Sequence, residues 1–261
     1  MANLWSYRGL ALNFFQREIK SRYAGSVSGL FWALIHPVAL LAVYAMVFST
    51  IFRVKFPELE GHGFIAFVAV ALWPWMAFQE SVQRGMVSIQ NGAGLIKKVA
   101  FPHELLVYGA VAATFAVHMA GMILALIILV LFGTLEIHVS ALPMVLLMLC
   151  VVFIVSAGMA LFLAALQTLL KDVEHFLVPL FMILFYATPI LYPASLVPLA
   201  ARQFIQLNPM TFLIERIRDG LLFGRAGLGW VDLGALLIGI LIFTFGRWFF
   251  NRLSPHFEDF L

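Results

Sequence analysis

The sequence predicts an all-α integral membrane protein with six transmembrane helices. Its composition is 63% hydrophobic and only 11% charged, and its mean hydropathy is +1.01. So few charged side chains cannot cover a water-facing surface, which excludes a soluble enzyme and a disordered protein. The apolar runs are long and continuous, whereas the strands of a membrane β-barrel alternate in short segments. Helices must therefore span the membrane, because they satisfy their own backbone hydrogen bonds.

Each predicted span suits a bilayer core of about 30 Å, which needs roughly 20 apolar residues. The last span carries Asp232 and Arg247 near its two ends, where both charges can reach the lipid headgroups. With a cytoplasmic N-terminus, ten of the 16 Lys and Arg residues fall inside and six outside, which predicts that both termini are cytoplasmic. The spans are approximately residues 30–52, 63–84, 105–132, 141–168, 175–192 and 229–250.

The chain divides into an N-terminal helix, residues 1–24, and a transmembrane domain, residues 25–261. One face of the N-terminal helix is apolar, with Leu12 and Phe15 among its residues, and the polar positions are basic. This pattern is typical of a helix that lies in the cytoplasmic membrane interface. The alternative is that the segment serves only as a basic anchor.

A short helix and turn are predicted between the second and third spans, over about residues 88–101. Gly92 loosens the backbone before two lysines, and Pro102 stops or kinks a helix. A loop that only fixes topology needs the lysines but has no reason to expose Ile96, Val99 and Phe101. We therefore expect a contact with another protein here.

The segment from about residue 194 to 224, between the fifth and sixth spans, is too long and too amphipathic for an ordinary loop. Pro193 and Pro198 break the end of the fifth span, and Asn208 with Pro209 is a turn signal before a second amphipathic helix. We expect a helical hairpin that re-enters the outer leaflet. The alternative is an extracellular loop with two surface helices.

Catalytic and metal-binding motifs are absent from the sequence. It contains no G-x-x-x-x-G-K-[ST] phosphate loop and no G-x-S-x-G nucleophile, and its seven histidines never pair at ligand spacing. We therefore expect no catalytic residue, no metal and no cofactor in this chain. The scattered basic residues form no patch for nucleic acid. Cys150 lies in an apolar run, where we expect it to pack.

Two of the polar residues in the predicted spans need an explanation. His118 is in the middle of the third span without an acidic residue near it in sequence, so a hydrogen bond between helices is the simpler reading and a proton relay the alternative. Glu80 ends the second span and is read as interfacial. Ion-driven transporters usually bury charges at the membrane midplane, so these spans indicate an energy source in a partner protein.

Aromatic residues recur on helical faces of three spans. Tyr44 and Phe48 are four residues apart in the first span, Trp75 lies in a cluster in the second, and Phe181 and Phe185 lie in the fifth, followed by Tyr186 and Tyr192. Aromatic faces stack on sugar rings. The alternative is that these side chains face lipid or form an interfacial belt.

Four blocks of this sequence are informative together. The first is QREIKSRYAGSVSGLFWALIHPVALLAVYAMVF, residues 16–48, and IKKVAFPHELL, LLKDVEHFLVPLFMILFYATPILYP and LNPMTFLIERIRDGLLFG follow in order. These blocks, which span nearly the whole chain, resemble the permeases of ABC-2 type polysaccharide exporters, which serve O-antigen, capsule and teichoic acid. The first block resembles their R-D-I-K-x-R-Y opening, with Glu18 in place of the usual Asp and Val27-Ser28 at a step that is often Leu-Gly or Val-Leu.

The resemblance implies a half-transporter in the bacterial inner membrane. Two copies of the chain would form a channel for a lipid-linked polysaccharide, and two separate ATPase subunits would bind ATP and Mg and dock beneath it. The chain itself would be no enzyme, and membrane lipid but no nucleic acid would be among its partners. An ABC-2 exporter of a drug or lipid is the alternative, and a membrane enzyme of lipid-linked glycan synthesis is a third reading.

The resemblance also assigns roles to residues. The candidate channel aromatics, chosen by helical face and not by a motif match, are Tyr44, Phe48, Phe181, Phe185 and Tyr186. The contacts of a coupling helix with the ATPase would be Lys97, Lys98, Val99 and Phe101. The interface helix would act through Arg17, Glu18, Lys20 and Arg22, and the gate hairpin through Pro193, Asn208, Pro209, Glu215 and Arg218.

Overall fold

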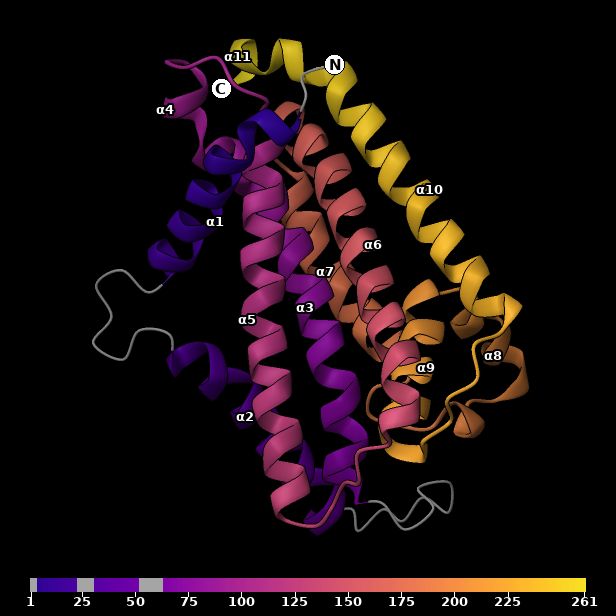
Figure 1. Cartoon of the computed structure of the whole chain (residues 1–261). Coiled ribbons are helices and arrows are strands. Elements are labelled where there is room, and N and C mark those ends of the chain that lie inside the picture. Colours follow the sequence, from indigo (N-terminus) through magenta and orange to yellow (C-terminus); the bar gives the residue numbers. More distant parts are fainter. Residues whose placement is uncertain (1–3, 23–30, 52–62) are drawn as a thin grey trace.

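The computed structural model describes residues 4–22, 31–51 and 63–261, and every regular element in these ranges is a helix (Figure 1). The longer helices are α1 (Arg8–Arg22), α2 (Phe31–Ala45), α3 (Phe64–Asn91), α5 (Glu104–Leu131), α6 (Leu142–Leu169), α7 (Val173–Ala187), α8 (Leu199–Gln206), α9 (Pro209–Phe223) and α10 (Trp230–Leu253). Short elements are η1 (Leu4–Tyr7), the π-helix η2 (Met46–Ile51), α4 (Ala93–Ile96), η4 (Val139–Ala141), η5 (Ala194–Leu196), η6 (Ser254–His256) and α11 (Phe257–Phe260).

Four helical segments of the described residues are long and apolar enough to cross a membrane. They are Phe64–Asn91, Glu104–Leu131, Val139–Leu169 and Trp230–Phe260. The first and fifth predicted spans correspond to shorter apolar helices, Ile35–Phe48 and Val173–Ala187. The structure thus supports four of the six predicted spans by length and composition.

The fifth helix, α7, ends at Ala187, five residues before the predicted end. Proline disfavours helical backbone in the residue before it, and Thr188, which precedes Pro189, has extended φ and ψ of −98° and 133°. In contrast, α3 continues to Asn91, past the predicted end at residue 84. The charges on Glu80 and Arg84 do not stop this helix, because both side chains find ion-pair partners.

Helix α3 is the centre of the bundle and packs against α5, α6 and α9. Small residues let the helices approach closely. A Cβ atom on Gly85 of α3 would lie 2.6 Å from the Cβ atom of Ala160 on α6. A Cβ atom on Gly246 of α10 would lie 2.0 Å from the carbonyl oxygen of Gly158 on α6. The α6–α10 crossing is thus a contact between two backbones.

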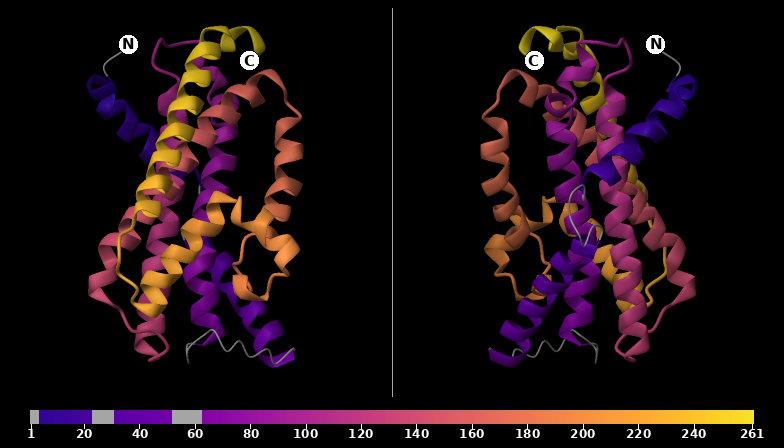
Figure 2. Two further views of the ribbon diagram at one scale, coloured as in Figure 1. Left: turned by 90° about the vertical axis from the view of Figure 1, so that its right-hand side faces the viewer. Right: turned by 90° about the vertical axis from the view of Figure 1, so that its left-hand side faces the viewer.

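Helix α1 lies across α5 (Figures 1 and 2). Its contact residue is Phe14, which is buried, whereas Leu12 of the predicted apolar face is 55% exposed. The position on α5 that permits the contact is Gly109, where a Cβ atom would lie 2.9 Å from the Cβ atom of Phe14. The apolar pattern of α1 did not identify this face, because the fit depends on a glycine 95 residues further along the chain.

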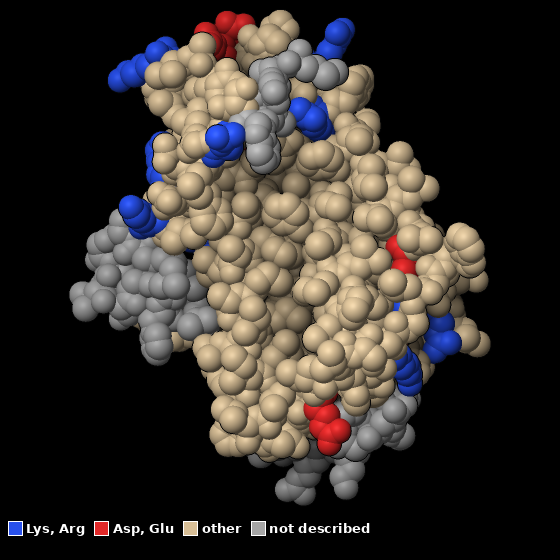
Figure 3. Space-filling view, viewed as in Figure 1, with Lys and Arg blue, Asp and Glu red and all other residues tan. Residues whose placement is uncertain are grey.

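The two ends of the bundle differ. Helices α4 and α11 lie at one end, which we call the α4 end, and α9 lies toward the other, the α9 end (Figure 1). On the face shown in Figure 3, a broad zone without Lys, Arg, Asp or Glu separates the charged residues of the two ends. An uncharged belt of this kind is expected of a surface that faces lipid.

Candidate functional site

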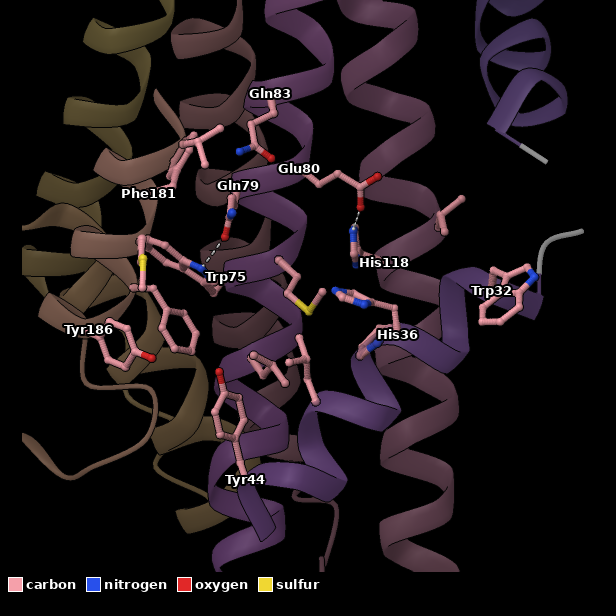
Figure 4. A pocket seen from close by; sticks show the side chains of 18 residues that line it. Trp32, His36, Tyr44, Trp75, Gln79, Glu80, Gln83, His118, Phe181 and Tyr186 are labelled. Carbon is pink, nitrogen blue, oxygen red and sulfur yellow. Dashed lines mark hydrogen bonds and ion pairs between the residues drawn. The ribbon is translucent and has the colours of Figure 1, made fainter. Parts of the chain in front are cut away.

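A cavity of about 590 Å³ lies among α2, α3, α5 and α7 (Figure 4). Its volume is in the range of typical ligand sites. Helix α7 contributes Phe181, Phe185 and Tyr186, and α2 contributes Tyr44 and His36. The cavity therefore joins helices that are more than 100 residues apart in sequence.

Aromatic rings form one side of this cavity. Trp75 is at the centre, with its ring centroid 6.3 Å from that of Phe181 and 6.0 Å from that of Phe185. The Tyr44 ring stacks on Phe185 at 6.1 Å, and Tyr186 meets the edge of Phe185 at 5.3 Å. Trp75 and Phe181 are buried, so these rings hold each other in fixed orientations.

Uncharged polar groups also line the cavity. The Trp75 indole Nε1 donates to Gln79 Oε1 at 2.9 Å, which leaves the Gln79 amide nitrogen available. Gln83, one helical turn further along α3, makes no hydrogen bond with a described residue, and neither does the His36 imidazole. Figure 4 shows these side chains around the same space. The site thus combines aromatic faces with hydrogen-bonding groups that a ligand could engage.

A cluster of charged residues forms the wall beside α5. Glu80 Oε1 lies 3.1 Å from Arg22 Nη2 and 2.6 Å from Arg84 Nε, and Glu80 Oε2 lies 2.6 Å from His118 Nε2. Arg22 Nη2 also donates to Thr114 Oγ1. The Arg22 side chain is 2% exposed, so its charge is compensated inside the protein.

His118 has no acidic residue near it in sequence, but in the structure it lies beside Glu80. The two residues are 38 positions apart, and the packing of α3 on α5 brings them together. The hydrogen bond between helices that was expected of His118 is present, with Glu80 as its partner. Because Arg22 is the last residue of α1, this cluster also ties α1 to two membrane helices.

The other residues assigned to the interface helix lie on the surface or near it. Glu18 Oε1 is 3.4 Å from Arg84 Nη1, so α1 and α3 share a second ion pair. Arg17 and Lys20 are exposed. Of the five assigned channel aromatics, Phe48 alone does not line the cavity, and its ring stacks instead on Phe64 at 5.2 Å.

At the α4 end, the segment 88–101 contains the last residues of α3, the short helix α4 and a turn. Ile96, which was expected to be exposed, is buried, because it packs in the core beside α5 and α6. Residues 88–91 end α3, α4 has only four residues, and Gly92 lies at the break between them with φ −92° and ψ 2°. Lys97, Lys98 and Val99 are exposed. Phe101 is partly covered, because its ring contacts the Phe14 ring of α1 at 5.5 Å. Of the four assigned contact residues, three are therefore open to solvent, and Phe101 packs against α1.

Helices α8 and α9 occupy the region assigned to the gate hairpin, at the α9 end. Asn208 caps α9, since its Oδ1 accepts from the Met210 backbone N–H at 3.0 Å. Its Nδ2 donates to Thr188 Oγ1 at 2.9 Å, which links α9 to the end of α7. Pro209 is the first residue of α9, where its missing N–H costs no helical bond, and Pro193 is buried before η5.

Arg218 fixes α9 to the chain that follows α7. Its guanidinium is buried, donates to the carbonyl oxygens of Pro189 and Ile190 at 2.9 and 3.1 Å, and lies 3.6 Å above the Phe67 ring. Burial lowers the pKa of Arg218 to about 9, so the side chain is still charged at neutral pH. Burial also raises the pKa of the Glu215 carboxyl, against the opposing effect of Arg218.

The sequence pattern of ABC-2 type transporters matches residues 11–222. The chain belongs to the ABC-2 type transporter family. The O-antigen export system permease protein RfbA of Myxococcus xanthus is 31% identical over 214 residues, which are 81% of this chain and 79% of that protein. A Klebsiella pneumoniae protein of the same name is 24% identical over 94% of this chain and 92% of its own length. The polysialic acid transport protein KpsM of Escherichia coli is 24% identical over 88% of both chains.

As an ABC-2 type transporter chain, the protein is a multi-pass membrane protein. The family match begins in α1 and ends in α9, so it contains the cavity, the Glu80 cluster and both α8 and α9. Among the residues that the structure describes, no three His, Cys, Asp or Glu side chains are grouped to hold a metal ion.

Several residues of this ABC-2 chain's cavity were missed from the sequence, namely Gln79, Gln83, His36 and Trp32. The helical spacing of Gln79 and Gln83 with Trp75 placed all three near one face of the second span. That spacing was a usable signal for the two glutamines. No comparable signal identified His36, because its approach to α3 depends on how α2 packs.

Proposed function

We propose that this chain is the permease half of an ATP-driven exporter that moves lipid-linked polysaccharide across the bacterial inner membrane. The observation that carries this proposal is the cavity, where Trp75, Phe185 and Tyr44 form aromatic faces beside the free amide groups of Gln79 and Gln83. The relatives named as O-antigen export permeases and a polysialic acid transporter support the cargo class.

The chemistry of sugars fits such a cavity. A pyranose ring presents C–H groups on its faces and hydroxyl groups at its rim, so its faces pack on aromatic rings while its hydroxyls bond amides. Aromatic contacts tolerate many ring types, as a channel that passes a repeating polymer requires. Weak individual contacts also let the polymer advance, because no unit is bound tightly.

The proposal includes α2 and α7 as membrane-crossing helices, giving six spans with both termini in the cytoplasm. Two copies of the chain form the channel, and α8 and α9 form a re-entrant hairpin at its outer end. Two separate ATPase subunits bind ATP and Mg, since this sequence has no phosphate-binding loop. Their docking surface is the exposed part of the α4 end, with Lys97, Lys98 and Val99.

The cavity is tested by the double substitution Tyr44→Ala and Phe185→Ala. We expect at least about fivefold less glycan export, because two stacking faces are lost, each worth about 0.5–1.5 kcal/mol. The measurement is surface glycan in a strain that lacks the native gene, with protein level and ATPase activity as references. Phe48→Ala is the matched control, since Phe48 is on the same face of the first span but outside the cavity.

Unchanged export by the double variant would remove the cavity from the path of the polymer. Equal loss in the Phe48→Ala control would point to general damage to the helices. Loss of a hydrophobic drug efflux activity in place of glycan export would favour the drug or lipid exporter.

Docking of the ATPase is tested by Lys97→Glu with Lys98→Glu. Both side chains are exposed, so the folded protein should persist. We expect co-purification of the ATPase to fall about tenfold or more, because charge reversal at an interface opposes association. Lys171→Glu is the control at another exposed position in the α6–α7 turn. Full recovery of the ATPase with the double variant would place the docking surface elsewhere.

A further inference from the structure

The charged groups near the cavity are all engaged with one another. Among the described residues that line the cavity, Glu80 is the only one that is Asp, Glu, Lys or Arg. Its carboxylate is directed to His118, away from Gln79 (Figure 4). Arg22 and Arg84 contact this carboxylate, and Arg84 also contacts Glu18. Two arginines and two glutamates thus balance in charge on the α1 side of the cavity.

The remaining polar groups of the cavity are neutral hydrogen-bonding groups. They are the amides of Gln79 and Gln83 and the hydroxyls of Tyr44 and Tyr186. None of the described lining residues is Lys or Arg. Sugar hydroxyls can exchange their bonds with water for bonds with these groups at little cost.

A sugar carboxylate would be poorly stabilised in this cavity. It loses hydration beside Trp75, Phe181 and Phe185, and it finds no lysine or arginine in the described lining to compensate the loss. Turning either arginine toward the sugar would remove one ion-pair partner of Glu80, and Arg22 is itself buried in this cluster.

We propose that this cavity selects uncharged sugar units and discriminates against sugars that carry a carboxylate. This inference rests on the proposed function and narrows its cargo class. The named relatives include a polysialic acid transport protein, and the sugar units of polysialic acid are acidic. Charge selection would therefore set this chain apart from that relative. Gln83 is the position at which a charge can be introduced to test this selection, because its side chain lines the cavity and has no hydrogen-bond partner among the described residues.

The test uses the permease with its ATPase partner in proteoliposomes. The two substrates are lipid-linked oligosaccharides that differ only in one position, a glucose in the first and a glucuronic acid in the second. We expect the neutral substrate to be transported about tenfold faster, the ratio that 1.4 kcal/mol produces. Gln83→Lys should reduce this ratio about tenfold, because the ammonium supplies the missing counter-charge.

Two further variants separate cavity charge from other effects. Asn91→Lys adds the same charge to an exposed site on the same helix, outside the cavity, and should leave the ratio unchanged. Gln83→Met removes the amide without adding charge and should not favour the acidic substrate. Transport of the neutral substrate by each variant shows that it is folded.

Transport by the wild-type protein distinguishes failure of charge selection from failure of the exporter function. Equal transport of both substrates overturns charge selection and leaves the exporter in place. An equal change in ratio from Gln83→Lys and Asn91→Lys also overturns it, because the effect would then be general surface charge. If neither substrate crosses while ATP is hydrolysed, the proposed function itself fails.

Discussion

Glu80→Ala is expected to lower the free energy of unfolding by about 3 kcal/mol. Removing one partner of a buried ion pair costs about 3–5 kcal/mol, because the other charge stays in a poorly solvated site. The lower end applies here, since the Glu80 side chain is 33% exposed while Arg22 is 2% exposed. The measurement is the denaturation midpoint of the detergent-solubilised protein, followed by tryptophan fluorescence.

Glu174→Ala is the matched control for this variant. Glu174 is exposed near the same end of the bundle and uses only its backbone N–H in a described hydrogen bond, to Gln167. We expect a change within about 0.5 kcal/mol. Glu80→Gln should lie between wild type and Glu80→Ala, because its amide oxygen can still accept. Equal midpoints for Glu80→Ala and wild type would show that the cluster does not hold α1, α3 and α5 together.

Gly246→Leu is expected to prevent stable packing of α10 on α6, with a loss of more than about 4 kcal/mol. The new Cβ atom would lie 2.0 Å from the carbonyl oxygen of Gly158 and 2.8 Å from its carbonyl carbon. Both are backbone atoms, so no side-chain rotation relieves the overlap, and the two helices must separate. The measurement is the yield of monodisperse protein on size exclusion, together with its thermal midpoint.

The control for this prediction is on the same helix. A Cβ atom on Gly234 meets no atom within 4 Å, so Gly234→Leu should express and elute as wild type does. Gly246→Ala should fail in the same direction as Gly246→Leu, because the Cβ atom alone causes the overlap. Normal yield of Gly246→Ala would mean that the helices cross with more space than the structure shows.

The extent of the apolar segments was predictable from sequence to within a few residues. The third span was expected at 105–132 and is α5, Glu104–Leu131. The fourth was expected at 141–168 and the helical segment is Val139–Leu169. These ends follow from local chemistry, because a polar turn cannot stay in the bilayer core and an apolar run must satisfy its backbone as a helix.

The end of a helix was predicted less well where its charged side chains form ion pairs with distant segments. The second span was cut at residue 84 because Glu80 and Arg84 were treated as boundary charges, whereas α3 carries them inside a helix that continues to Asn91. Glu80 pairs with Arg22 and His118, and Arg84 pairs with Glu18. No local rule connects these three residues with α3. The extended conformation of Thr188, in contrast, was readable in principle from Pro189.

The candidate site was partly predictable. Four of the five assigned aromatics line the cavity, because helical spacing identifies side chains on one face. Spacing does not show what the face meets, so Phe48 was included and the polar residues Gln83 and His36 were not.

By itself, the sequence determined that this protein is a helical membrane protein, where its apolar segments lie and which family it resembles, since those depend on composition and local order. Only the tertiary structure decided which residues meet, because each helix can rotate about its axis without changing its own hydrogen bonds. That rotation is fixed by contacts between distant segments, such as Gly158 with Gly246 and Phe14 with Gly109. The same contacts place Glu80 beside His118 and so separate the charged wall from the neutral lining of the cavity.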